Sequence, residues 1–225
     1  MADGVHSSSL CLSRWLEQHG GFMADQIHIS GEPRGLYANA PIVAGDLLLS
    51  VPSALLLTAG AAAGDKSLAE ADALIMMLLQ ERSRGAASRL SPWIQTLPDR
   101  RSFESSLPLL WDEARAAALL RCPVAIERLR AQRASVRARF AALGTSPRAD
   151  GSVRPSWHDY LWAWACVESR TFHARDGVDG VEEERSCIVP VADMLNHDAS
   201  QVGGRAWEVG RRAYEEVPRK PTRSG

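Results

Sequence analysis

The chain has 225 residues, of which 45% are hydrophobic and 24% charged, so it can bury a sizeable core in one domain or in one domain with an insertion. Its formal net charge of −1 gives no overall electrostatic reason to expect a nucleic acid or an anionic membrane as partner. No stretch approaches the roughly 20 apolar residues that a transmembrane helix needs. We therefore expect a globular protein of the cytoplasm or nucleus, with an organelle left open.

The cysteines are widely spaced, without CxxC pairs and without the spacing to histidine that is typical of zinc sites. This pattern predicts free thiols in a reducing compartment. The four cysteines are Cys11, Cys122, Cys166 and Cys187. The histidines His28, His158 and His173 are equally scattered, so we predict no metal site.

The first quarter of the chain predicts one helix followed by short strands. The stretch SSLCLSRWLEQHGG (residues 8–21) has apolar residues at helical spacing and ends in two glycines, which stop a helix. Residues 26–58 contain short apolar or β-favouring runs, separated by Pro41, Gly45 and Pro52. These runs predict short strands and turns.

The middle of the chain is predicted to be helical. Apolar residues recur three and four apart after Ser67, which predicts a helix as far as about Arg82, with Ser67 and Glu70 as a capping pair. Further helices are predicted over residues 108–120, over residues 123–143, and from Ser156 to the stretch ESRTF.

The last part contains an acidic stretch and a short apolar run. The stretch RDGVDGVEEERS (residues 175–186) is interpreted as a solvated loop, and CIVPVADM (residues 187–194) as a short strand. Four hydrogen-bonding side chains then follow within six positions, in PVADMLNHDAS (residues 190–200). The order of strands, helices and strand predicts an α+β fold.

Four stretches occur in the order and approximate spacing of one family. They are GEPRGLYANAPIVAGDLLLSVP (31–52), SPWIQTLP (91–98), CVESRTF (166–172) and PVADMLNHD (190–198). Over roughly residues 10–198, the chain resembles the SET-domain methyltransferases, specifically the subfamily of the plant Rubisco large-subunit lysine methyltransferase. The resemblance implies a SET-like α+β fold of short strands and small sheets, interrupted by a helical insertion.

The resemblance also implies a division of the chain into four segments. These are the N-terminal helix with the first part of the SET core (1–60), the helical insertion (61–155), the second part of the core (156–198) and a divergent, disordered tail (199–225).

Members of this family transfer a methyl group from S-adenosylmethionine to the side-chain nitrogen of a protein lysine, and in a few relatives of a histidine. By resemblance, Glu32, Pro33 and Arg34 lie against the cofactor, and Asn196 and His197 contact it. Taken alone, the first three residues would be an ordinary surface turn, and the other two would belong to a turn after a strand.

The resemblance places Arg170 between the cofactor and substrate pockets, and Asp193 near the channel for the target lysine. A carboxylate there could attract an ammonium. The open alternatives are a cation at a helix C-terminus for Arg170 and a capping or turn residue for Asp193.

A basic segment offers a competing function. Seven arginines and a single acid, Glu127, lie between Arg121 and Arg148. No aromatic residues interleave with these arginines and a buried stripe includes Leu129 and Val136, so a solvated helix face is favoured over a nucleic-acid surface.

The expected partner is a protein that presents a lysine, bound by a monomeric chain.

The chain departs from the family pattern at its C-terminus. The family continues past Asn-His with a strand pair and a Ser-Tyr-Gly-like motif, whose tyrosine lines the methyl-transfer channel. After Ala199 the only tyrosine is Tyr214, in a stretch that does not match. We therefore expect a truncated SET fold with an unknown catalytic residue and little or no activity. The alternative is a non-catalytic SET-like module or a fragment.

Overall fold

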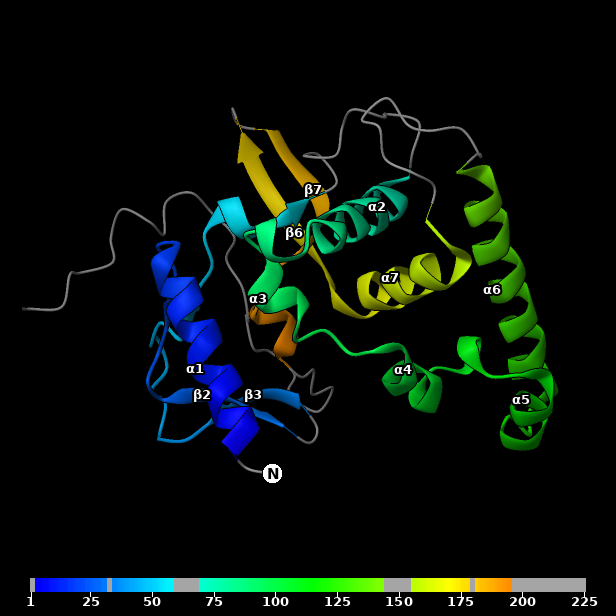
Figure 1. Cartoon of the computed structure of the whole chain (residues 1–225), viewed down its shortest axis with the longest axis horizontal. Coiled ribbons are helices and arrows are strands. Elements are labelled where there is room, and N and C mark those ends of the chain that lie inside the picture. The colour runs from blue at the N-terminus through cyan, green and yellow to red at the C-terminus, as the bar shows by residue number, and fades with distance from the viewer. Residues whose placement is uncertain (1–2, 32–33, 59–68, 144–154, 179–180, 196–225) are drawn as a thin grey trace, which may run out of the picture.

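The computed structural model describes residues 3–31, 34–58, 69–143, 155–178 and 181–195 (Figure 1). Helices and small antiparallel sheets are combined along this part of the chain. The predicted α+β class is therefore confirmed.

The described strands form three small sheets. In the first two, β1 (Phe22–Met23) pairs with β4 (Leu49–Ser50), and β2 (Ile27–Gly31) pairs with β3 (Arg34–Ala38). In the third, β7 (Val181–Ile188) lies between β5 (Leu57–Thr58) and β6 (Thr171–Val178).

The structure contains helix in every segment where the sequence predicts it, with shifted ends. The α-helices are α1 (Asp3–Gln18), α2 (Glu70–Ser83), α3 (Ser91–Ile94), α4 (Arg100–Ser106), α5 (Glu113–Leu119), α6 (Pro123–Ala142) and α7 (Trp157–Arg170). Short 3-10 turns occur at Ser53–Leu55 (η1), Gly85–Ala87 (η3), Pro108–Leu110 (η4) and Ala192–Met194 (η5). The helix predicted over residues 108–120 is thus divided into a 3-10 turn and α5.

Helices α2 and α7 pack against each other and supply much of the core (Figure 1). Leu74, Ile75 and Leu78 of α2 are fully buried, as is Tyr160 of α7. Their spacing of three and four residues places them on one helical face, as the apolar periodicity predicts. Burying each large apolar side chain contributes about 1.5–3 kcal/mol to folding.

Side-chain caps begin several helices but not α2. Ser156, Asp99 and Asp112 each accept a hydrogen bond from the backbone N–H three residues further on, at the starts of α7, α4 and α5. Helix α2 begins at Glu70 without a side-chain cap. Ser67, its predicted capping residue, lies outside the described residues.

The stretch predicted as a solvated loop is instead part of a β-hairpin. Strands β6 and β7 pair from Thr171 opposite Ile188 to Val178 opposite Val181. The acidic composition misled the prediction, because the hydrogen bonds between paired strands are made by backbone groups and do not require apolar side chains. The end of the hairpin near Ile188 is held in place because Ile188 also pairs with buried Leu57 of β5. Two Asp-Gly dipeptides, at residues 176–177 and 179–180, occur in this stretch, and such dipeptides are a hairpin signal that could have predicted the pairing of its flanks.

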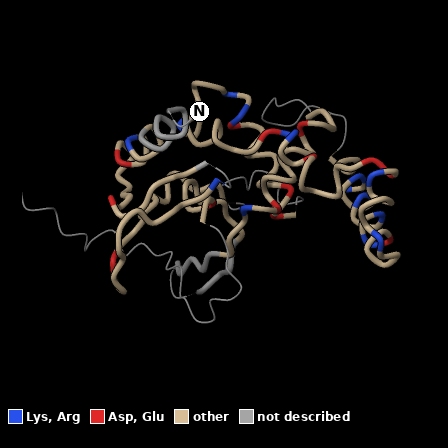
Figure 2. Tube along the Cα trace, turned by 90° about the horizontal axis from the view of Figure 1, so that it is seen from below, with Lys and Arg blue, Asp and Glu red and all other residues tan. Residues whose placement is uncertain are grey.

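Helix α6 lies at the edge of the molecule and is rich in arginine (Figures 1 and 2). Two of its arginines attach it to other elements. Arg133 donates to the backbone carbonyls of Leu109 at 3.2 Å and Pro108 at 3.1 Å, while Arg139 contacts Asp72 of α2. At least two arginines of this basic segment therefore hold α6 against the rest of the fold.

Asp72 is a buried carboxylate that joins three helices. Its Oδ1 accepts from the hydroxyl of Tyr160 at 2.9 Å and from Nη2 of Arg139 at 3.0 Å. Burial and the neighbouring carboxylate raise the pKa of Tyr160. This network connects α2, α6 and α7, and it contains none of the predicted site residues.

Candidate functional site

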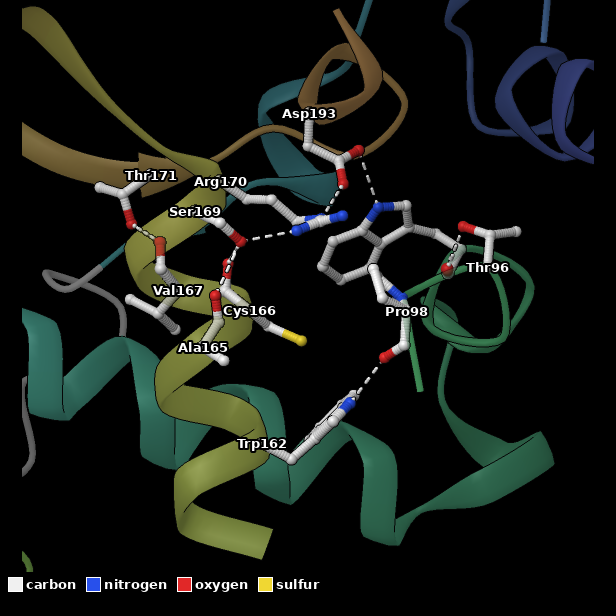
Figure 3. Close-up of polar contacts among 11 residues, drawn as sticks. Thr96, Pro98, Trp162, Ala165, Cys166, Val167, Ser169, Arg170, Thr171 and Asp193 are labelled. Atoms are coloured by element: carbon white, nitrogen blue, oxygen red, sulfur yellow. Dashed lines mark hydrogen bonds and ion pairs between the residues drawn. The ribbon is translucent and has the colours of Figure 1, made fainter. Parts of the chain in front are cut away.

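Two predicted site residues that are far apart in the sequence, Arg170 and Asp193, form an ion pair, and a third, Arg34, lies within electrostatic reach of them. Arg34 begins β3, Arg170 is the last residue of α7, and Asp193 lies in the turn η5. Nε of Arg170 is 3.1 Å from Oδ2 of Asp193 (Figure 3). Burial lowers the pKa of Arg34, with Asp193 raising it and Arg170 lowering it further, so Arg34 lies within electrostatic reach of both.

The other four predicted cofactor contacts, Glu32, Pro33, Asn196 and His197, lie outside the described residues. Their roles therefore stay predictions. In the chain, the first two directly precede Arg34 and the last two follow three residues after Asp193. Both groups are thus adjacent in sequence to described members of the cluster.

The carboxylate of Asp193 is completely buried, and both of its oxygens are engaged. Its side chain is 0% exposed and that of Arg170 is 13% exposed. Oδ1 accepts a hydrogen bond of 3.0 Å from Nε1 of Trp93. The contact to Arg170 is an ion pair whose N–H is not aligned for a hydrogen bond. Burial raises the pKa of Asp193, and this is opposed chiefly by Arg170 and then by Trp93.

This burial does not support the expected attraction of an ammonium by Asp193. A carboxylate that is shielded from solvent and paired with a guanidinium exerts little net pull on a further cation. The geometry favours an orienting role, in which Asp193 holds the guanidinium of Arg170.

The end of α7 fixes Arg170 from its own side. Nη1 of Arg170 donates to Oγ of Ser169 at 2.7 Å, and that hydroxyl donates to the carbonyl of Ala165 at 2.7 Å (Figure 3). Thr171 donates in the same manner to the carbonyl of Val167 at 2.7 Å. These bonds satisfy carbonyls in the last turns of the helix and fix the direction from which Arg170 approaches Asp193.

The turn that carries Asp193 is strained. Val191 has φ 71° and ψ −46°, and among the described residues it alone has a positive φ without being glycine. For a β-branched residue this conformation is an outlier that costs on the order of 1–3 kcal/mol. Backbone bonds from Asp193 to Val189 at 2.9 Å and from Met194 to Val191 at 3.1 Å hold the turn. The strain occurs where the chain turns Asp193 inward.

Trp93 is not among the site residues predicted from the sequence. Trp93 lies in α3, within the motif SPWIQTLP. The signal that could have found it is a tryptophan inside a motif that the resemblance had already singled out.

A cavity of about 280 Å³ lies elsewhere, between α2, α7 and the segment from α3 to α4. Arg82, His158 and Trp162 are among its lining residues, and none of the predicted site residues is. The Arg82 guanidinium stacks on the Trp162 ring at 4.1 Å. This cavity is distinct from the Arg34–Arg170–Asp193 cluster.

Within the part of the chain that the structure describes, no helix has both the length and the apolar character to cross a bilayer. In the same residues, no group of three or more His, Cys, Asp or Glu side chains is arranged to hold a metal ion.

No family model matches the chain. Two curated relatives are each called SET domain-containing protein 4. The protein from Artemia parthenogenetica is 26% identical, and the alignment covers 76% of this chain and 45% of that protein. The mouse protein is 25% identical, with 95% of this chain and 52% of that protein covered. The chain thus spans about half the length of the curated relatives that it matches.

Among solved structures, the chain is similar to Rubisco LSMT. The complex with sinefungin and monomethyllysine matches with a TM-score of 0.69 and 22% identity, over 89% of this chain and 47% of that one. The complex with AdoMet matches with a TM-score of 0.67 and 23% identity, over 86% and 45%. The predicted resemblance is confirmed: the chain has the SET-domain fold of Rubisco LSMT, and its curated relatives are SET-domain proteins.

Proposed function

We propose that this chain is the cofactor-binding part of an S-adenosylmethionine-dependent protein-lysine methyltransferase. The proposal is supported by the SET-domain fold and by the AdoMet and monomethyllysine bound in Rubisco LSMT. The observation that carries it is the buried ion pair between Arg170 and Asp193, with Arg34 within electrostatic reach, since the family motifs assign all three residues to the cofactor and substrate pockets.

The charges of this cluster fit an anionic ligand group. Arg170 is paired with the buried carboxylate of Asp193, and half-buried Arg34 lies within electrostatic reach of both, so the three side chains together carry one excess positive charge. Burying an uncompensated charge is costly, and an arriving carboxylate would offset that cost. The methionine part of S-adenosylmethionine has such a carboxylate. We propose that Arg34 binds it, since Arg170 is already paired with Asp193.

The chemistry that S-adenosylmethionine supplies when bound is a methyl group on a sulfonium, open to in-line displacement. The chain's own residues contribute binding and orientation, because positioning lowers the barrier of such a displacement more than acid–base catalysis does. Arg170 is proposed to lie between the cofactor and the acceptor amine. A lysine that enters a desolvated channel is shifted toward its neutral, nucleophilic form.

The proposed partner is a protein that presents a lysine to this site. The monomethyllysine bound in Rubisco LSMT supports the acceptor type. A monomeric state, a cytoplasmic or nuclear location and the lack of nucleic-acid binding are proposals from the sequence alone.

A second candidate is a non-catalytic SET-like binding module. It is favoured by one observation, namely that the sequence after Ala199 has no match to the tyrosine-bearing motif of the family. The two candidates differ in methyl transfer. Incubation of a form of the protein that includes a tyrosine-bearing segment with methyl-labelled S-adenosylmethionine and lysine-containing proteins, followed by amino-acid analysis, would give methyllysine under the first proposal. Cofactor binding by that form without any transfer would favour the second.

Calorimetric titration with S-adenosylhomocysteine tests the cofactor site. We expect the folded chain to bind with micromolar affinity, and Arg34→Gln to weaken binding by about tenfold, as expected for a lost charge-assisted hydrogen bond. Arg128→Gln is the matched control, because Arg128 is an exposed arginine on α6. Absence of binding by a wild-type chain with a native circular dichroism spectrum would overturn the proposal.

A further inference from the structure

We infer that Trp93 is a positioning residue of the cofactor site, whose indole N–H fixes the Asp193 carboxylate that in turn holds Arg170. The inference rests on the proposed function, because it concerns the same cluster. It adds a residue from outside the motifs that were assigned to the cofactor, and it gives the segment around α3 a part in the site.

The two oxygens of Asp193 are held from two directions. Oδ1 accepts from Nε1 of Trp93 at 3.0 Å, and Oδ2 contacts Nε of Arg170 at 3.1 Å. An aspartate side chain has only two torsions, so one contact on each carboxylate oxygen defines the orientation of the carboxylate plane. Without the indole, the carboxylate could rotate about its bond to Cβ, and the position of Arg170 would no longer be unique.

Trp93 is itself held rigidly. Its side chain is fully buried. Its carbonyl accepts from the backbone N–H of Thr96 at 2.8 Å and from the Thr96 hydroxyl at 2.7 Å, which fixes the end of α3. The donor is therefore preorganised, so little conformational entropy is lost when it bonds to Asp193.

The acceptor sets Trp93 apart from three other indoles whose N–H groups are hydrogen-bonded. Trp15, Trp111 and Trp162 each donate to a backbone carbonyl, at 2.8, 3.0 and 2.9 Å respectively. Such bonds attach one element to another. Trp93 donates to an ionisable side chain 100 residues away in the sequence, so its bond controls where a charge lies. Hydrogen bonds to charged groups are roughly twice as strong as neutral ones.

A consequence is that α3 is coupled to the site. The motif SPWIQTLP carries Trp93, while Arg170 ends α7 and Asp193 follows β7. Any displacement of α3 would reach the Arg170 guanidinium through a single hydrogen bond and a single ion pair.

A double-mutant cycle with S-adenosylhomocysteine binding tests the inference. We expect Trp93→Phe to weaken binding by about tenfold, the size expected for a hydrogen bond to a charged group. Trp162→Phe is the matched control, because it removes a buried indole N–H that bonds to the backbone of Pro98; we expect less than about a threefold effect. In the Asp193→Ala background, which has no side-chain acceptor left for the indole, Trp93→Phe should add little. Wild-type affinity in Trp93→Phe, or full additivity of the two changes, would overturn the inference.

A spectroscopic measurement separates this inference from the proposed function. In the ¹H–¹⁵N spectrum, Asp193→Asn replaces a charged acceptor with a neutral one and should shift the indole proton of Trp93 upfield, leaving that of Trp162 in place. This holds even if the chain binds no S-adenosylhomocysteine or if Trp93→Phe does not fold. An unchanged Trp93 indole resonance in Asp193→Asn would overturn the positioning role by itself.

Discussion

Arg170 and Asp193 form an ion pair that is almost entirely removed from solvent, with 3.1 Å between Nε and Oδ2. The pair connects the end of α7 with the turn that follows β7. A buried pair of this kind adds little net stability, because the cost of desolvating both charges offsets their attraction, but removing one partner leaves an uncompensated charge.

Removing Arg170 should therefore destabilise the fold strongly. We expect Arg170→Met to lower the free energy of unfolding by about 3–5 kcal/mol. In contrast, the double variant Arg170→Met with Asp193→Leu should recover much of that loss, since no charge remains buried. Urea denaturation of the three proteins measures this. Equal stability of the single and double variants would argue against a buried, uncompensated carboxylate.

The stability of the single variant Arg170→Met should depend on pH, because the pKa of Asp193 is raised by burial. A carboxyl group whose folded-state pKa is raised stabilises the fold below its unfolded pKa of about 3.9, and this contribution is lost as the pH rises through the folded value. Loss of Arg170 removes the largest influence that opposes the rise. Arg170→Met should hence be closest to wild type in stability in acid and fall furthest below it at neutral pH. A stability difference that does not change between acid and neutral pH would contradict this assignment.

The thiols should divide into two classes. Burial raises the pKa of Cys166 to about 12 and also raises the pKa of Cys187, whereas Cys11 and Cys122 are exposed. At pH near 8, iodoacetamide should modify Cys11 and Cys122 quickly and leave the buried thiols of Cys166 and Cys187 unmodified until the chain unfolds, because the thiolate is the reactive form. Mass spectrometry of digests reads the result, and rapid labelling of Cys166 in the native chain would show that this side of the site is open.

Tyr160 should matter for stability but not for the cofactor. Its hydroxyl donates to buried Asp72, so Tyr160→Phe leaves that carboxylate short of a partner and should lower the free energy of unfolding by about 1–3 kcal/mol. The affinity for S-adenosylhomocysteine should stay within about twofold of wild type. Tyr160 and Asp72 share no contact residue with the Arg170–Asp193 pair, and changes at such independent sites have little effect on each other. A large loss of affinity in this variant would mean that the Asp72 network belongs to the site.

Because the backbone of Val191 is strained, we expect a glycine variant at this position to be more stable than an alanine variant. Alanine is normally preferred to glycine in folded backbone, but at φ 71° glycine avoids the steric cost that any side chain meets. Val191→Gly should thus be more stable than Val191→Ala by on the order of 1 kcal/mol, although both lose the buried valine side chain. Thermal unfolding of the two variants compares them directly, and a more stable alanine variant would remove the argument for strain.

The sequence predicted those parts of the structure that depend on local pattern. Apolar periodicity gives α2, α6 and α7, and the hydroxyl of Ser156 gives the start of α7. The family motifs supplied Arg170 and Asp193, and the structure brings these two side chains together.

What the sequence missed depends on long-range contacts. The hydrogen bond between Trp93 and Asp193 spans 100 residues, and no local pattern encodes it. The buried, paired state of Asp193 follows from that bond and from Arg170, so its role as an attractor of ammonium could not be tested from spacing alone. Val191 is a residue type that ordinarily predicts extended backbone, and tertiary packing overrides that preference.

Hydrogen exchange of the folded chain with and without S-adenosylhomocysteine would locate the ligand as well as detect it. If the cofactor binds beside Arg34 and Asp193, saturating ligand should slow amide exchange in peptides that cover β3 (Arg34–Ala38) and η5 (Ala192–Met194) and leave exchange in α6 unchanged. Unchanged exchange in both peptides, or protection only around the cavity lined by Arg82 and Trp162, would show that the cofactor does not bind there.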